Sequence, residues 1–334
     1  MQLEDIFIND KIWKTFTDGE RAEYIDKVFH YYKEIRGFPY YEVSLEQKHK
    51  DFQTAKKYLK RKDILVDRVV RQTMHLLGTI NSYFPEMWEV QCHNQLTPKD
   101  VFDDDELFRT AIERRLKYGT YMSDSGIRKA IKRFPNTQGV SNFRPTASYA
   151  IYENFCPDNA VVWDMCSGWG GRFMGAMLST KVRKYIGTDV EQYVFDAHVE
   201  MKRDFESLRP IELQMLDNDY PSEEVDLCFT SPPYFDTEKY GESENQSFRQ
   251  FTSQESWLND FMGTMIKRCR RRLSSNGSMF INIANVKGYP TLQSDLIYLA
   301  IQNDFQYIDT LKLSLSNINK GGFKYEPIFH FKPI

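Results

Sequence analysis

The chain has 334 residues and a net charge of −3, with 41% hydrophobic and 27% charged residues. This balance is typical of a soluble globular protein with one large or two moderate domains, and it excludes a chain that is basic throughout. Five scattered cysteines without a C-x-x-C pair argue against a disulfide framework, and the six histidines form no zinc-binding pattern. We expect no signal segment and no membrane span, and therefore a cytoplasmic protein without a bound metal.

Residues 1–137 are predicted to form a mainly α-helical domain. Apolar residues recur at helical spacing in 63–84, 103–119 and 123–134, and the second of these segments begins with acids and ends with bases. Between Arg109 and Arg144, nine basic residues stand against two acidic ones. Such a segment binds nucleic acid in some proteins and is only a solvated surface in others, and charge alone does not decide between the two.

Residues 138–334 change to short apolar or β-branched runs that alternate with helix-length segments. The predicted strands are 160–166, 184–190, 211–216, 225–230 and 278–286, the predicted helices are 171–180, 191–208 and 257–274, and 317–333 is expected to form two more strands. Strands that alternate with helices indicate an α/β fold, in which a mostly parallel sheet carries helices on both faces. Ligands of such sheets bind at the carboxyl ends of the strands.

The first predicted strand runs directly into a glycine loop, "SGWGGR" (167–172). Phe173 stands where a dinucleotide-binding G-x-G-x-x-G would need glycine, and no phosphate-binding loop is present, so a nucleoside ligand without a phosphate chain is favoured. Three acids follow three successive strands. We expect Asp164 to face a cationic methionine amino group, Asp189 to accept both ribose hydroxyls and Asp217 to accept from an adenine amino group. Any one of them alone would more commonly cap a helix or turn.

Three motifs, "DMCSGWGGR", "YIGTDV" and "TSPPYFDTEKYG", in this order, resemble those of the S-adenosylmethionine-dependent amino-methyltransferases that modify DNA bases, of the phage and restriction type. The resemblance covers 142–334 and implies a Rossmann-like class I methyltransferase sheet with S-adenosylmethionine as cofactor. The segment 142–155 resembles the part of that family that encloses the methionine end. The implied cofactor-binding residues are Asp164, Cys166, Gly168, Gly170, Gly171, Asp189, Val190 and Asp217.

The resemblance places the catalytic residues at Ser231, Pro232, Pro233 and Tyr234. An exocyclic base amine is a poor nucleophile because its lone pair is delocalised into the ring, so the enzyme must localise that pair and align the amine. By resemblance, the Ser231 hydroxyl and the Pro232 carbonyl accept the two amine hydrogens, and the prolines hold the backbone rigid. Tyr234 would stack on a base flipped out of double-stranded DNA. Phe235 and Tyr240 are further expected substrate contacts.

The N-terminal domain is the candidate for reading the DNA target, because the catalytic region has no room for a separate recognition domain. Its expected phosphate contacts are Arg114, Arg115, Lys129, Lys132 and Arg133. A role in dimerisation or partner binding is the alternative. Serine before Pro-Pro-Tyr favours N4 of cytosine over N6 of adenine without settling the base. An RNA base amino-methyltransferase and a catalytically silent nucleic-acid-binding protein of the same fold stay open, as does the existence of a cognate restriction enzyme.

Overall fold

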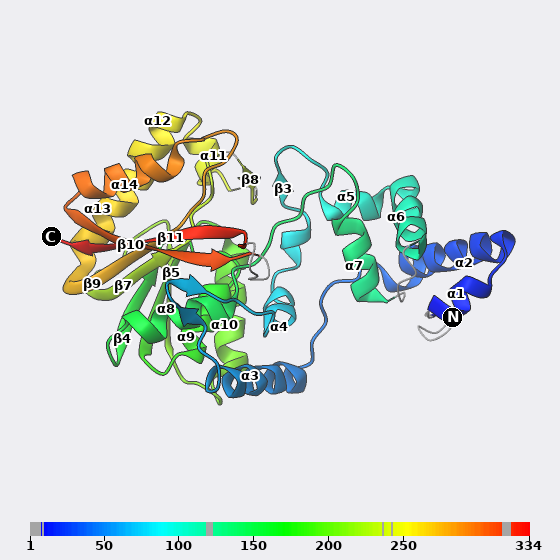
Figure 1. Cartoon of the computed structure of the whole chain (residues 1–334), viewed down its shortest axis with the longest axis horizontal. Helices are drawn as coiled ribbons and strands as arrows, with labels where there is room; N and C mark the ends of the chain where they lie inside the picture. Colours follow the sequence, from blue (N-terminus) through cyan, green and yellow to red (C-terminus); the bar gives the residue numbers. More distant parts are fainter. Residues whose placement is uncertain (1–7, 9, 118–122, 236, 242, 316–321) are drawn as a thin grey trace. The chain divides into compact units, whose positions relative to one another are not determined.

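A computed structural model describes residues 8, 10–117, 123–235, 237–241, 243–315 and 322–334 of the chain (Figure 1). The chain divides into two compact units, each built from three stretches. The helical unit comprises Met1–Glu42, Pro85–Ser141 and Glu238–Tyr240, and the sheet unit comprises Val43–Phe84, Asn142–Thr237 and Gly241–Ile334. One crossing, between Ser141 and Asn142, lies close to the predicted boundary after residue 137. The other crossings have no counterpart in the sequence analysis.

The helical unit consists of short helices with well-capped ends. Its elements are α1 (Asp10–Thr15), α2 (Asp18–His30), the π-helix η2 (Tyr31–Arg36), the 3-10 helix η3 (Pro85–Trp88), α5 (Pro98–Asp103), α6 (Asp105–Lys117), α7 (Asp124–Lys132) and the two-residue strands β3 (Gln91–Cys92) and β8 (Glu238–Lys239). Helices α6 and α7 confirm two of the three helices predicted in this region. Strand β8 pairs with β3 in antiparallel fashion, so the segment after the Pro-Pro-Tyr motif forms part of this unit.

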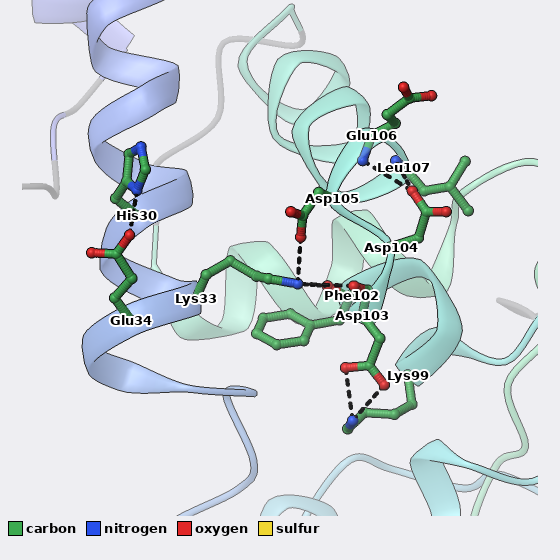
Figure 2. A network of polar contacts seen from close by, with 10 residues as sticks. All are labelled: His30, Lys33, Glu34, Lys99, Phe102, Asp103, Asp104, Asp105, Glu106 and Leu107. Atoms are coloured by element: carbon green, nitrogen blue, oxygen red, sulfur yellow. Dashed lines mark hydrogen bonds and ion pairs between the residues drawn. The ribbon is translucent and has the colours of Figure 1, made fainter.

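One lysine connects η2 to the junction of α5 and α6 (Figure 2). The ammonium group of Lys33 donates to the carbonyls of Phe102 at 3.3 Å and Asp103 at 2.9 Å, and it pairs with the Asp105 carboxylate at 2.7 Å. These carbonyls end α5 and lack intrahelical partners. At the same junction, the Asp104 carboxylate accepts from two backbone N–H groups of the first turn of α6. The junction is therefore held by caps at both helix ends.

The sheet unit contains, among its described residues, a nine-stranded sheet in the order β1-β2-β10-β11-β9-β7-β4-β5-β6. The strands are β1 (Leu65–Val66), β2 (Val69–Val70), β4 (Ala160–Asp164), β5 (Val182–Asp189), β6 (Glu212–Asp217), β7 (Val225–Thr230), β9 (Leu273–Asn282), β10 (Phe305–Ser314) and β11 (Tyr325–Pro333). Strands β6, β5, β4, β7 and β9 are parallel, and β11 runs antiparallel to both β9 and β10. This topology confirms the predicted Rossmann-like α/β sheet of mostly parallel strands.

Among the five parallel strands, β4 comes first in the chain and lies in the middle. The chain passes from β4 outward through β5 and β6, and then returns to β7 on the opposite side of β4. In a doubly wound sheet this reversal opens a crevice at the carboxyl ends of the two central strands, and ligands bind there. The end of β4 carries the glycine loop, and the end of β7 carries the Ser-Pro-Pro-Tyr motif.

Helices cover both faces of the sheet (Figure 1). The helices of the sheet unit are α3 (Leu45–Leu59), α4 (Leu77–Asn81), α8 (Pro145–Phe155), α9 (Gly171–Leu178), α10 (Gln192–Phe205), α11 (Ser247–Gln250), α12 (Gln254–Ser256), the π-helix η4 (Trp257–Met262), α13 (Gly263–Arg272) and α14 (Leu292–Gln302). Successive strand residues point to opposite faces. Trp163 of β4 packs in one core cluster with residues of η4, α13 and α14, whereas Phe229 and Phe280 contact the rings of Tyr152 and Phe155 from α8.

The predicted helix over 63–84 is wrong in its first half. A hairpin, β1 and β2, occupies 65–70, and a helix appears only at α4. The hairpin turns through Asp67 and Arg68, both with φ in the left-handed region at 50° and 62°. The structural reason is tertiary, because β2 pairs in parallel with Lys312 and Leu313 of β10. Apolar residues that show a helical period in sequence here extend the sheet instead.

Two elements near the C-terminus have no counterpart in the sequence analysis. The helix α14 was not predicted, and the partner strand of β11 is β10 over Phe305–Ser314, upstream of the hairpin expected within 317–333. Only the second strand, β11, lies in the predicted range, and residues 317–321 lie outside the described residues. In the part of the chain that the structure describes, no helix combines the length and hydropathy needed to cross a bilayer.

Candidate cofactor and base site

The glycine loop takes a backbone path that requires glycine. Gly168 and Gly170 have φ of 51° and 70°, and Gly170 caps the N-terminus of α9. A Cβ at Gly171 would lie 2.0 Å from the carbonyl oxygen of Phe143. The segment 142–155 therefore packs directly on the loop, and the side chain of Asn142 donates to the Trp169 carbonyl at 2.6 Å. Its contact with the loop agrees with the enclosing role that the sequence indicates.

Asp164 ends β4 as a fully buried carboxylate. Its Oδ2 accepts from Arg172 Nε and from the Tyr185 hydroxyl, both at 2.6 Å. Arg172 also donates to the Cys166 carbonyl and so ties the start of α9 to the start of the loop. A buried ion pair of this kind needs every partner, because removal of one leaves an uncompensated charge. Asp164 is thus placed to hold the loop, and its contact with a cationic ligand stays a prediction. Sequence reasoning did not identify Arg172 as a site residue.

Asp189 ends β5 beside the loop. One carboxylate oxygen accepts from Gly168 N at 2.8 Å, and the other accepts from Val190 N at 2.9 Å and Glu191 N at 3.3 Å. Burial raises the pKa of this carboxyl to about 6, although the three backbone donors act in the opposite direction. The predicted ribose acceptor therefore contacts the glycine loop directly. Val190 supplies a backbone donor to it, whereas Asp217 is exposed at the end of β6.

The register of β4 and β7 brings the loop and the motif together. Trp163 is paired with Cys228, so β4 and β7 end side by side, at Asp164 and at Thr230. A hydrogen bond of 3.1 Å from Cys166 N to Thr230 Oγ1 joins the two segments. Burial raises the pKa of the Cys166 thiol well above its usual range, which keeps it protonated and inert.

A buried hydroxyl lies in the same loop. Ser167 Oγ has no hydrogen-bond partner among the described residues, although the side chain is almost completely buried. Buried polar atoms are normally satisfied, so this hydroxyl is suited to a polar group of a ligand. Together with the Asp189 carboxylate and the glycine backbone, it gives the loop the donors and acceptors that a nucleoside requires.

The motif leaves β7 as a rigid turn. Pro232 is buried, whereas Ser231, Pro233 and Tyr234 are partly exposed. The Tyr234 hydroxyl donates to the Asn282 carbonyl at 3.4 Å, which connects the ring to the carboxyl end of β9. The turn places a serine hydroxyl, a proline carbonyl and an aromatic ring at the carboxyl edge of the sheet.

The two further predicted substrate contacts lie elsewhere. Phe235 is buried in the core cluster, where its ring contacts Trp257 and Tyr289 at centroid distances of 6.3 and 6.0 Å. Its φ of 55° turns the backbone sharply after the motif. Tyr240 belongs to the helical unit, and its hydroxyl donates to Glu238. The described contacts thus give both residues structural roles, and a contact with substrate stays a prediction.

Sequence reasoning missed Glu191, which holds the segment after the motif against the end of β5. Its Oε1 accepts from the Gln246 side chain at 2.5 Å and from Ser243 N at 3.3 Å. A Cβ at Gly241 would lie 2.4 Å from the same oxygen, which explains glycine at the end of "KYG". Because Asp189 accepts from Glu191 N, the predicted ribose acceptor is connected through one residue to Ser243 and Gln246.

We expect Glu191→Ala to loosen this segment. A hydrogen bond to a charged group contributes about 1.5–3 kcal/mol, so trypsin cleavage after the exposed Arg249 should rise by about tenfold. Gln246→Ala should give a similar rise, and the double variant little more, because both changes remove the same bond. The exposed pair of Gln192 and Asp196 is a matched control whose loss should leave the cleavage rate unchanged. Additive effects of Glu191→Ala and Gln246→Ala would contradict the coupling.

The five cationic side chains of the helical unit that are predicted to contact phosphates differ in their exposure to solvent. Arg114, Lys129 and Arg133 are exposed, and the Arg114 guanidinium lies 5.5 Å from the centroid of the Phe134 ring. Lys132 instead donates to the Val140 carbonyl at 2.6 Å. Arg115 is partly buried. Three of the five cations are therefore presented to solvent.

Comparison with known families agrees with this geometry. Residues 225–333 match the family of DNA methylases. The match confirms the resemblance on which the sequence analysis rests. It covers about a third of the chain, from β7 with the Ser231 motif to the end of β11, and the glycine loop lies upstream of it. The family match and the sheet topology together support an S-adenosylmethionine-dependent methyltransferase, with S-adenosylmethionine as cofactor.

Solved structures are similar only in general outline. They include a methyltransferase from Pyrococcus furiosus (15% identity, 56% of this chain and 82% of that chain, TM-score 0.40) and TrmN from Thermus thermophilus (14%, 57% and 49%, 0.40). A third is TYW2 from M. jannaschii in complex with AdoMet (14%, 56% and 74%, 0.36). Identities and TM-scores this low give no information about the substrate of this chain. No curated protein sequence gives a significant match.

Proposed function

We propose that this DNA methylase relative transfers a methyl group from S-adenosylmethionine to the exocyclic amine of a base flipped out of double-stranded DNA. N4 of cytosine is favoured over N6 of adenine, because serine precedes Pro-Pro-Tyr. The observation that supports the proposal is the pairing of β4 with β7, together with the hydrogen bond from Cys166 N to Thr230 Oγ1, which joins the start of the glycine loop to the residue before Ser231. An acceptor for the amine thus lies beside the loop suited to the cofactor.

Each residue of the site has a defined task in this reaction. Bound S-adenosylmethionine supplies a methyl group made electrophilic by its sulfonium. Asp189 and the backbone of the glycine loop hold the nucleoside part, with Ser167 Oγ as a further polar contact. Ser231 Oγ and the Pro232 carbonyl accept hydrogen bonds from the two N–H groups of the amine, which localises the nitrogen lone pair and directs it at the methyl group. The methylated amine then loses one proton. Tyr234 stacks on the extruded base, whose amine cannot be reached inside the duplex.

Nucleoside mass spectrometry on DNA and RNA from cells that express the protein tests the proposal. N4-methylcytosine in DNA is the expected product, and N6-methyladenine would correct only the base. Both marks should be absent from cells that express Ser231→Ala. Modified RNA without modified DNA would overturn the DNA assignment, and the absence of any mark together with the absence of cofactor binding by calorimetry would overturn the enzymatic one.

The exposed cations of the helical unit are proposed to neutralise DNA phosphates. Each neutralised phosphate adds about 0.9 to the slope of log affinity against log salt concentration. The triple variant Arg114→Ala/Lys129→Ala/Arg133→Ala should therefore show a slope shallower by about 2–3, with the thermal unfolding temperature unchanged. Fluorescence anisotropy on a labelled duplex between about 50 and 200 mM salt measures this. An unchanged slope would favour the alternative, in which this unit mediates dimerisation or binds a partner.

A further inference from the structure

A second cluster of cations lies in the sheet unit itself, in the segment that the sequence analysis assigned to the helical domain. Between Lys57 and Arg71, six basic residues stand against two acidic ones, in a chain whose net charge is −3. Five of these side chains are exposed, and we call them the 57–71 basic surface: Lys57, Lys60, Arg61, Lys62 and Arg71. The sixth, Arg68, pairs with Asp309 at 3.3 Å and is not counted.

Local structure gathers these five side chains. Lys57 lies in the last turn of α3, away from the buried Phe52, Ala55 and Leu59, and Lys60 and Arg61 follow directly after the helix end. A backbone hydrogen bond of 2.7 Å from Arg71 N to the Ile64 carbonyl brings Arg71 back beside the chain that follows Lys62. Among the described residues, no carboxylate forms an ion pair with any of the five cations. Asp63 and Asp67 are exposed within the same segment and reduce its charge without pairing with them.

The sheet topology places the Arg71 end of this surface at the carboxyl edge of the strands. Strand β10 runs parallel to β9, because both are antiparallel to β11, so its last residue Ser314 lies at the same edge as Ser231. Strand β2 pairs in parallel with the end of β10, and the Gln72 side chain donates to the Ser314 carbonyl. Beyond it, Thr73 N donates to Thr146 Oγ1 at 3.0 Å, in the segment that packs on the glycine loop.

We propose that the 57–71 basic surface binds the phosphate backbone of the DNA strand next to the flipped base. The proposal rests on the proposed function and adds a contact surface within the sheet unit. A base that enters at the carboxyl edge brings its flanking phosphates along that edge, and unpaired Lys and Arg side chains there supply the charge that such a backbone needs. These contacts position the duplex and carry no sequence information.

The test is the salt dependence of binding to a labelled DNA duplex by the full-length variant Lys60→Ala/Arg61→Ala. The matched control is Lys267→Ala/Arg271→Ala, which removes two exposed cations from α13, a helix that leads into the amino end of β9. At low salt we expect about tenfold weaker binding for the first variant and a slope shallower by about 1–2, with wild-type values for the control. The charge-conserving variant Lys60→Arg/Arg61→Lys should behave as wild type, with thermal unfolding as the check on folding.

Equal slopes for wild type and Lys60→Ala/Arg61→Ala, with both proteins folded, would overturn the proposed surface. The same loss in both alanine variants would also overturn it, since the effect would then follow total charge and not position. Methyl transfer to DNA by the wild-type protein is measured in parallel and tests the proposed function separately. A methylating wild type with an unaffected alanine variant would leave that function standing and reject only the surface.

Discussion

Ser231→Ala is expected to lower the rate of methyl transfer by at least about 100-fold while it leaves the affinity for S-adenosylmethionine unchanged. The change removes the side-chain acceptor that localises the lone pair of the amine, and loss of one preorganised hydrogen-bonding group typically costs about 10²–10³ in kcat. Cofactor affinity should persist, because Asp189 and the glycine loop lie on other strands. Transfer of a radiolabelled methyl group to DNA and calorimetry with the cofactor measure the two quantities.

Two further variants test whether the loss of the side-chain acceptor accounts for the lower rate. Ser231→Asn keeps a side-chain oxygen as acceptor and should retain more activity than Ser231→Ala. Ser275→Ala removes an exposed serine of β9 and should be indistinguishable from wild type. If Ser231→Ala transferred methyl groups at the wild-type rate, Ser231 would not be the acceptor, and the Pro232 carbonyl would be the remaining candidate.

Affinity for S-adenosylmethionine is expected to fall as the pH is lowered through about 6. Burial raises the pKa of the Asp189 carboxyl to about 6, and only the ionised form can accept from both ribose hydroxyls. The cofactor thus binds the deprotonated protein more tightly, so the Kd should be constant above pH 7 and rise towards tenfold per pH unit below the pKa. Calorimetry between pH 5 and 8 measures the profile. A Kd that is flat across this range would contradict the assignment.

Asp189→Asn should remove the pH dependence and weaken binding by about 100-fold. The Asn side chain has one acceptor oxygen, and its NH₂ group would face Gly168 N–H or Val190 N–H, which now donate to the two carboxylate oxygens. A lost hydrogen bond to a charged group costs about 1.5–3 kcal/mol, and about 2.7 kcal/mol corresponds to the expected change in Kd. Asp217→Asn is the comparison, because Asp217 is exposed and should affect binding less.

The central sheet could be predicted from the sequence because each of its strands shows a recognisable apolar pattern within a few residues. The strand β4 is buried along its whole length, and its continuous apolar run with a glycine loop behind it is distinctive. The order of three acids and the Ser-Pro-Pro-Tyr motif then indicated the edge at which they meet. The hairpin β1–β2 was predicted as helix because its strands are two residues long and depend on β10, more than 240 residues away.

The parts of the site that sequence did not predict are those set by tertiary contacts. Asp164 stands at the end of a strand, just before the glycine loop, which is a position typical of a ligand-binding acid. Only the structure shows that Arg172 and Tyr185 are bonded to it. Glu191 stands two residues after the predicted ribose acceptor and gives no signal of its own, since its partner Gln246 lies 55 positions away. Glycine at 241 was the one available sign, because it stands where the Glu191 carboxylate leaves no room for a Cβ.

The pairing of β8 with β3 has a consequence for the engineering of hybrid enzymes. The helical unit is not a cassette at one end of the chain, because its last stretch, Glu238–Tyr240, follows the Ser231 motif closely. A chimaera that exchanged only residues 1–141 for those of a relative would replace β3 and keep β8, so the donor's strand would face a partner that it did not evolve with. Transplanting this unit intact therefore means splicing three separate pieces, one of them within a few residues of the proposed catalytic serine.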